Sequence, residues 1–160
     1  MKKKVMALVL SALMVTGLVG CGNNNDNSAD SKESTLKVGM ITDSGTIDDK
    51  SFNQGTWEGI IEAEEKLGIE KNYLKPSGET EADYLTEIQN LYDSGYKFIV
   101  GPGFKLETAI YKAQEKYQDA KFVILDGAPM DEDGNYVVAD NTVAIQFAEH
   151  EGGFAAGVAA

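Results

Sequence analysis

Short apolar runs alternate with segments of helical spacing from Leu36 onward, and this alternation restricts the fold more than any other feature of the sequence. The runs are continuously apolar and recur at intervals of roughly thirty residues. Continuous apolar strands that are separated by helices are typical of a parallel sheet with helices on both faces. The pattern therefore predicts an α/β fold with a doubly wound parallel sheet. The four predicted strands are LKVGMIT, a weaker NYLKPS, KFIVGPG and KFVILDG.

Three helical faces are predicted between these strands, because apolar residues recur there three and four positions apart. Gly68 and Gly95 follow the first two helical segments and are expected to end them. Beyond the fourth strand, YVVAD and TVAIQF are expected to be extended, and EHEGGFAAGVAA is expected to be helical. The predicted helices occupy residues 52–67, 84–92 and 106–117.

The N-terminal segment has the layout of a secretory signal. Three lysines precede an uncharged apolar run of about fifteen residues, which is shorter than the roughly twenty that span a membrane. The sequence Leu18-Val19-Gly20-Cys21 closes this run and resembles a bacterial lipobox. We therefore expect residues 1–20 to be a lipoprotein signal peptide and Cys21, the single cysteine, to carry the lipid, palmitate included. An ordinary cleavage site with an incidental cysteine is the alternative.

Residues 21–35 are expected to form a lipidated flexible tether, because no large apolar side chain follows Cys21 in this stretch. Removal of residues 1–20 leaves 11 basic and 26 acidic residues, a net charge of −15. This charge argues against nucleic acid as a partner, since phosphates require a basic face. Attachment to an anionic membrane must then be covalent. The expected location is the extracytoplasmic face of the cell membrane, through the lipid anchor.

The carboxyl ends of the strands are the expected ligand site, as in other doubly wound sheets. The loops that follow the strands there are Asp43-Ser44-Gly45, Gly101-Pro102-Gly103-Phe104 and Asp126-Gly127. Each loop offers either a carboxylate or glycines that let a ligand approach the backbone. Ser44, Asn53, Gly101 and Gly127 are candidates from their loop positions alone.

The sequence lacks the groups that most enzymes need. The stretch GPGFKL has leucine at the third glycine of a dinucleotide fingerprint, and no nucleophile elbow is present. The single histidine, His150, lies in a late helical segment, and the aspartates between residues 43 and 49 match no calcium-loop spacing. No metal or cofactor is expected. A hydrolase that uses Asp43 as its nucleophile is an alternative, although Gly45 stands where a second aspartate is needed.

A binding protein needs carboxylate acceptors and a flat apolar side chain for stacking. Phe52 is the candidate, because it begins a predicted helix beside the loop that bears Asp43. The alternative is that Phe52 packs under the loop as a staple. Ser51 and the glutamine three residues later fit a Ser-x-x-Gln capping box, so Ser51 is expected to cap this helix, with Asp48 or Asp49 as alternatives.

Three motifs in this order, together with the lipobox, are shared with a known family. They are Asp43-x-Gly45 with Asp49-x-Ser51-Phe52-Asn53 and Gly59, then Phe122-Val-Ile-Leu-Asp-Gly127, then Asn141-Thr-Val-Ala-Ile-Gln-Phe-Ala-Glu-His-Glu-Gly-Gly-Phe154. The chain thereby resembles the basic membrane protein (BMP) family of lipoproteins, which are the substrate-binding components of ABC-type nucleoside importers. The resemblance covers residues 36–160.

This resemblance implies the N-terminal lobe of a type I periplasmic-binding-protein fold, a purine nucleoside as ligand and an ABC permease as partner. It also implies that Phe52 stacks on the base and that Asp43 or Asp126 accepts hydrogen bonds from the base or ribose. A binding protein for a sugar or signalling ligand on the same fold is the alternative. Together with the candidates from loop position, the expected ligand-binding residues are Asp43, Ser44, Phe52, Asn53, Gly101, Asp126 and Gly127.

Family members are more than twice as long as the mature chain. The resemblance therefore implies a first lobe over residues 36–138, then an interlobe crossover and the start of an incomplete, truncated second lobe over residues 139–160. Residues 36–138 are enough to bury a usable core. A clamp with one lobe cannot close on a ligand, so we expect this stretch alone to bind nucleosides weakly or not at all, and a full-length version to bind them tightly.

Overall fold

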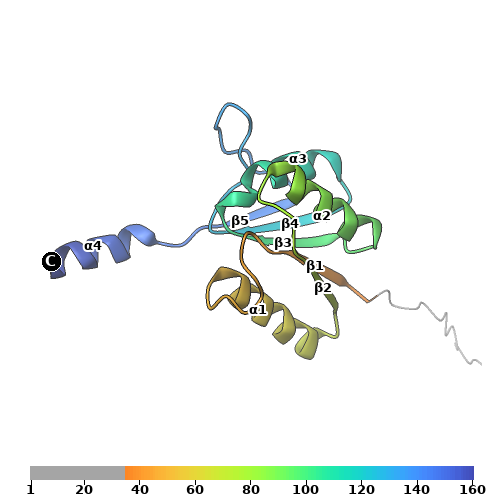
Figure 1. The fold of residues 1–160 in the computed structure, drawn as a ribbon, viewed down its shortest axis with the longest axis horizontal. Helices are drawn as coiled ribbons and strands as arrows, with labels where there is room; N and C mark the ends of the chain where they lie inside the picture. Colours follow the sequence, from red (N-terminus) through yellow and green to blue (C-terminus); the bar gives the residue numbers. More distant parts are fainter. Residues whose placement is uncertain (1–34) are drawn as a thin grey trace, which may run out of the picture. The chain divides into compact units, whose positions relative to one another are not determined.

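A five-stranded parallel sheet organises the computed structural model, which describes residues 35–160 (Figure 1). The strand order is β2-β1-β3-β4-β5, and every pair of neighbours is parallel. The predicted α/β fold with a parallel sheet is confirmed. The strands are β1 (Lys37–Ile41), β2 (Glu70–Leu74), β3 (Phe98–Pro102), β4 (Lys121–Leu125) and β5 (Thr142–Ile145), and the helices are α1 (Phe52–Leu67), α2 (Glu81–Asp93), the 3-10 turn η1 (Phe104–Leu106), α3 (Glu107–Lys116) and α4 (Glu149–Ala159).

Helices cover the two faces of the sheet unequally. Helix α1 lies on one face, whereas α2 and α3 lie side by side on the other (Figure 1). The α1 face has a small core around Met40, Ile60 and Val100. The larger core on the other face includes Ile88 and Ile110. Strands β1 and β3 are central and buried on both faces, which explains why their sequences are continuously apolar.

Two of the predicted elements differ from the observed ones. Strand β2 starts at Glu70, earlier than NYLKPS predicts, because Glu70 to Leu74 pair in register with all of β1. The YVVAD segment is not a strand, apart from one isolated bridge at Tyr136. The amide of Val137 donates to the Pro129 carbonyl at 2.8 Å, and the Val137 carbonyl accepts from the Gln114 side chain at 2.8 Å. The segment is therefore held by a loop and by α3.

Strand β5 continues the sheet past the boundary expected at residue 138. It pairs with β4 from Thr142 to Ile145, which moves the end of the first sheet to at least Ile145. Helix α4 follows β5, and each of its residues is exposed. That residues 146–160 begin a second lobe stays a prediction. Among residues 35–160, no helix is long and apolar enough to cross a membrane.

Candidate functional site

Three loops meet at the carboxyl edge of the sheet, where parallel strands place the residues that follow them. Lys105, in the 3-10 turn after β3, joins two of the other loops. Its Nζ donates to Ser44 Oγ at 3.0 Å and to Glu79 Oε2 at 2.6 Å. The loops after β1, β2 and β3 are thus linked through one ammonium group. Ser44 is at the expected edge, but its hydroxyl oxygen already accepts a hydrogen bond.

Asp43 presents its two carboxylate oxygens differently. Oδ1 accepts from the Gly45 amide at 2.8 Å and from Asn53 Nδ2 at 2.6 Å. Oδ2 accepts no hydrogen bond from the described residues, and it would lie 3.6 Å from a Cβ at Gly103. Gly103 has a φ of 97°, a conformation that favours glycine, and its lack of a side chain leaves space beside this oxygen. Asp43 can therefore accept hydrogen bonds from a bound molecule through Oδ2.

Asn53, expected from its position to contact a ligand, is buried inside the loop. Its side chain is 1% exposed. Its Nδ2 donates to Asp43 Oδ1 at 2.6 Å and to Asp49 Oδ2 at 2.7 Å, while its Oδ1 accepts from the Asp43 amide at 3.1 Å. Both donors of the amide are used inside the loop. Asn53 thus belongs to the framework of the site rather than to its surface.

Asp49, one of the expected alternatives, caps helix α1. The Ser51 hydroxyl makes no cap hydrogen bond, so the expected capping box is wrong. Instead, Asp49 Oδ1 accepts from the amides of Ser51 and Gln54 at 2.8 Å and 3.1 Å. Burial acts to raise the pKa of Asp49, but hydrogen bonds from Asn53 and from these amides outweigh it and lower the pKa below its usual value.

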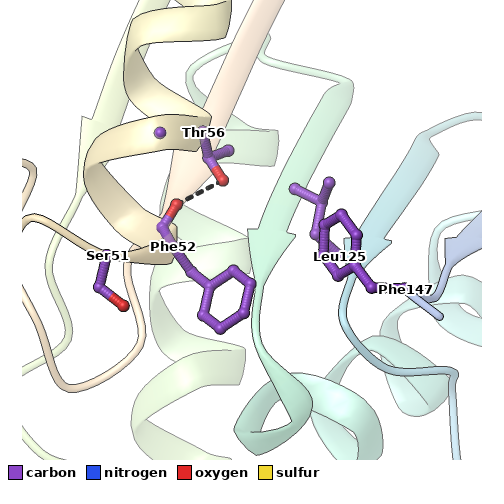
Figure 2. A pocket seen from close by; sticks show the side chains of 6 residues that line it. Ser51, Phe52, Thr56, Leu125 and Phe147 are labelled. Atoms are coloured by element: carbon purple, nitrogen blue, oxygen red, sulfur yellow. Dashed lines mark hydrogen bonds between the residues drawn. The ribbon is translucent and has the colours of Figure 1, made fainter. Parts of the chain in front are cut away.

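Phe52 lines a pocket of about 470 Å³ (Figure 2). The ring is 44% exposed, so Phe52 is not a buried staple. It faces Phe147, with the ring centroids 6.0 Å apart and the planes at 28°. Figure 2 shows both rings directed into the space between α1 and the end of β4. The full lining is Ser51, Phe52, Gly55, Thr56, Leu125 and Phe147.

Asp126 lies in a different cavity, of about 350 Å³. Its φ is 58°, a left-handed conformation, and its amide donates to the Ile145 carbonyl at 2.7 Å. Burial and a hydrogen bond to Glu149 raise the pKa of Asp126. The structure thus separates the expected ligand residues among three cavities, because Asp43 and Ser44 line a third one of about 120 Å³. The second cavity is lined by Phe104, Glu107, Asp126, Gly127, Tyr136, Gln146 and Glu149.

The two candidate glycines serve close packing. A Cβ at Gly101 would lie 3.0 Å from Ile110 Cδ1, so the absence of a side chain at Gly101 lets α3 pack against β3. A Cβ at Gly127 would lie 2.9 Å from Glu107 Oε1 and 3.2 Å from the Phe104 Cα. Gly127 therefore lets the β4 loop approach η1 and α3. Cys21 lies outside the described residues, and no three metal-ligating side chains cluster within them.

Phe147 and Lys105 are site residues that sequence reasoning missed. Phe147 ends the apolar run TVAIQF, and its exposed ring could have been recognised from the strand that precedes it, which carries the residue to the same edge of the sheet. Lys105 has no comparable signal, because its partners Ser44 and Glu79 are distant in sequence.

A family model described as "ABC transporter substrate-binding protein PnrA-like" matches residues 36–160. The chain belongs to this family, Bmp. Other Bmp-like relatives carry names such as lipoprotein and basic membrane protein. This membership agrees with the resemblance to the basic membrane protein family that the sequence motifs predict.

Individual relatives agree with this membership. A "CD4+ T-cell-stimulating antigen" of Listeria innocua is 36% identical over 170 residues, and an "ABC transporter nucleoside-binding protein BmpA" of Lactococcus lactis is 34% identical over 168 residues. Each alignment covers 100% of this Bmp chain but 45% of the relative. A solute-binding protein structure from Aeropyrum pernix K1 superposes with a TM-score of 0.62 at 26% identity, over 72% of this chain and 30% of that one.

Proposed function

We propose that this Bmp-family protein binds a purine nucleoside outside the cell and delivers it to an ABC permease while Cys21 anchors it to the membrane through lipid. The observation that carries the proposal is the exposed aromatic ring of Phe52, which lines a pocket at the carboxyl edge of the sheet. At the same edge, Asp43 Oδ2 accepts no hydrogen bond from the described residues. The name of the Lactococcus relative supports the nucleoside as ligand class.

The chemistry of these two residues suits an uncharged, flat molecule with hydrogen-bond donors. The Phe52 ring can stack on a base, and such contacts contribute on the order of 1–3 kcal/mol per base. Asp43 Oδ2 can accept from a ribose hydroxyl or a base N–H. A carboxylate that is buried by a ligand without a donor loses its hydrogen bonds to water, which disfavours that ligand.

The pocket is open in the described residues, since Phe52 and Phe147 are both half-exposed. The chain also spans about half the length of the relatives it matches. We infer that a second lobe closes over this edge in the full-length protein and completes the contacts on the other side of the base.

Isothermal titration of the full-length gene product with guanosine and adenosine tests the proposal. We expect Phe52→Ala to weaken binding by roughly tenfold or more, because a stacking contact is lost. Phe52→Leu is the matched variant, since it keeps apolar volume without an aromatic face, and it should recover only part of the affinity. Equal binding by all three proteins would remove Phe52 from the site, and competition by ribose without competition by purines would favour a sugar as the ligand.

A further inference from the structure

Two carboxylates and one buried amide form the base of the loop between β1 and α1. The amide of Asn53 is the only direct link between Asp43 and Asp49 among the described residues, because its Nδ2 donates to both carboxylates. Asp49 in turn accepts from the amides of Ser51 and Gln54, at the N-terminal end of α1. The chain of contacts therefore runs from the helix end through Asn53 to Asp43.

The amide of Asn53 performs two tasks in the loop. Its two N–H groups donate to the neighbouring carboxylates and offset part of their repulsion, and its carbonyl oxygen accepts from the Asp43 backbone amide at 3.1 Å. An aspartate at this position would add a third negative charge. A leucine would leave Asp43 Oδ1 with the Gly45 amide as its single donor.

Gly45 shows how tightly this arrangement is packed. A Cβ at Gly45 would lie 2.4 Å from Asn53 Nδ2, 2.5 Å from Asp49 Oδ2 and 3.3 Å from Asp43 Oδ1. The loop backbone therefore lies directly against all three polar groups. Asp43 has little room to rotate while Asn53 is in place.

We propose that Asn53 is a positioning residue for ligand recognition, which holds Asp43 Oδ1 toward the loop and so leaves Oδ2 directed at the ligand. This rests on the proposed function, in which Asp43 is an acceptor for the nucleoside. Asn53 touches no ligand itself, because it is 1% exposed and its donors are used. Its effect on affinity is exerted through Asp43.

Asn53→Leu in the full-length protein tests the proposal, with Asn141→Leu as the matched control. Asn141 is also a buried asparagine, and its Nδ2 donates to the carbonyls of Gln114 and Tyr117, away from the loop of Asp43. We expect Asn53→Leu to lower guanosine affinity on the order of tenfold, since hydrogen bonds to a charged group are lost. Asn141→Leu should stay within about twofold of wild type, measured where circular dichroism shows both variants folded. Similar losses in the two variants would overturn the proposal.

The pH dependence of nucleoside affinity in Asn53→Asp distinguishes a positioning role from a purely structural one. Its side chain would face Asp43 and Asp49, with the Lys105 ammonium acting on Asp43 from the next loop. Binding a proton restores one donor to the cluster. The affinity lost in Asn53→Asp should therefore be partly regained between about pH 7 and pH 5, whereas the loss in Asn53→Leu should not. A parallel pH dependence of the two variants would contradict the proposal.

Hydrogen exchange separates this proposal from the proposed function. If the wild-type protein binds no nucleoside, the proposed function fails, and amide exchange measured by NMR still decides whether Asn53 holds the loop. The amides of Asp43 and Gly45 should exchange faster in Asn53→Leu and at the wild-type rate in Asn141→Leu. Unchanged exchange in Asn53→Leu would refute the positioning role.

Discussion

Tyr84 gives the sharpest stability prediction, because its hydroxyl is buried without a partner. The residue lies on α2 in the larger core and is 1% exposed. Within residues 35–160, no group is in hydrogen-bond contact with its hydroxyl. Such an orphan hydroxyl costs roughly 1–3 kcal/mol relative to water. We therefore expect Tyr84→Phe to raise the free energy of unfolding by about 1 kcal/mol.

Tyr96→Phe is the matched control, since Tyr96 is also buried but its hydroxyl donates to Glu70 Oε1 at 2.8 Å. This variant should lose about 1 kcal/mol. Urea denaturation at neutral pH, followed by circular dichroism, measures both changes. A loss of stability in Tyr84→Phe comparable to that in Tyr96→Phe would mean that the Tyr84 hydroxyl has a partner, and the reasoning would be refuted.

Urea denaturation repeated at high pH gives an independent check. Burial raises the pKa of Tyr84 above its ordinary value of 10.0 and outweighs the opposite effect of the Lys105 charge. In wild type, the folded state therefore keeps this proton longer than the unfolded state, and the associated stability is lost as pH rises from about 10 through the folded pKa. Tyr84→Phe lacks this loss, so its advantage over wild type should widen above pH 10.

Three further predictions concern the edge of the sheet and one helix end. Gly45→Ala should lower both stability and nucleoside affinity, since its Cβ would displace Asn53 and Asp49, and unchanged urea and titration midpoints would argue against the loop geometry. Asp126→Asn should stabilise the chain at neutral pH, because the raised folded pKa of Asp126 means that its ionised form destabilises the folded wild type above that pKa. The gain should vanish below about pH 3.8, where Asp126 is protonated in both states. A difference in urea midpoint that does not change with pH would contradict this. Thr80→Ala removes the capping box of α2, in which Thr80 Oγ1 accepts from the Asp83 amide at 3.3 Å, and should cost about 1 kcal/mol in thermal unfolding; no change would show that the box contributes nothing.

Elements with a strong local signal could be predicted from the sequence. The first helix was predicted over residues 52–67 and is observed as Phe52–Leu67, with Gly68 at a φ of 67° ending it. Both signals, the apolar spacing of the helix and the glycine at its end, can be recognised from residues that are close together in the sequence. Strands β1 and β3 could be predicted for a similar reason, because burial on two faces requires an unbroken apolar run. The edge strand β2 is largely exposed, and its start was not predicted correctly.

Features that depend on distant partners could not be predicted. The capping box at Ser51 has the right spacing, yet the carboxylate of Asp49 is already held at the helix end by Asn53 and displaces the hydroxyl. Gly101 looks like a ligand loop in sequence, but its role is decided by Ile110 on a helix that packs against it. Likewise, the sequence does not indicate that the Asn53 side chain donates both of its N–H groups to two carboxylates.

The outer strand of the sheet has a practical consequence for handling the protein. Among residues 35–160, strand β5 pairs with β4 alone. Val143 and Ile145 are 57% and 40% exposed on the same sheet face as α1, in a part that α1 does not cover. An open backbone edge with branched apolar side chains is a template for further strand pairing. Concentrated samples of the chain should therefore polymerise along β5 before their interior unfolds.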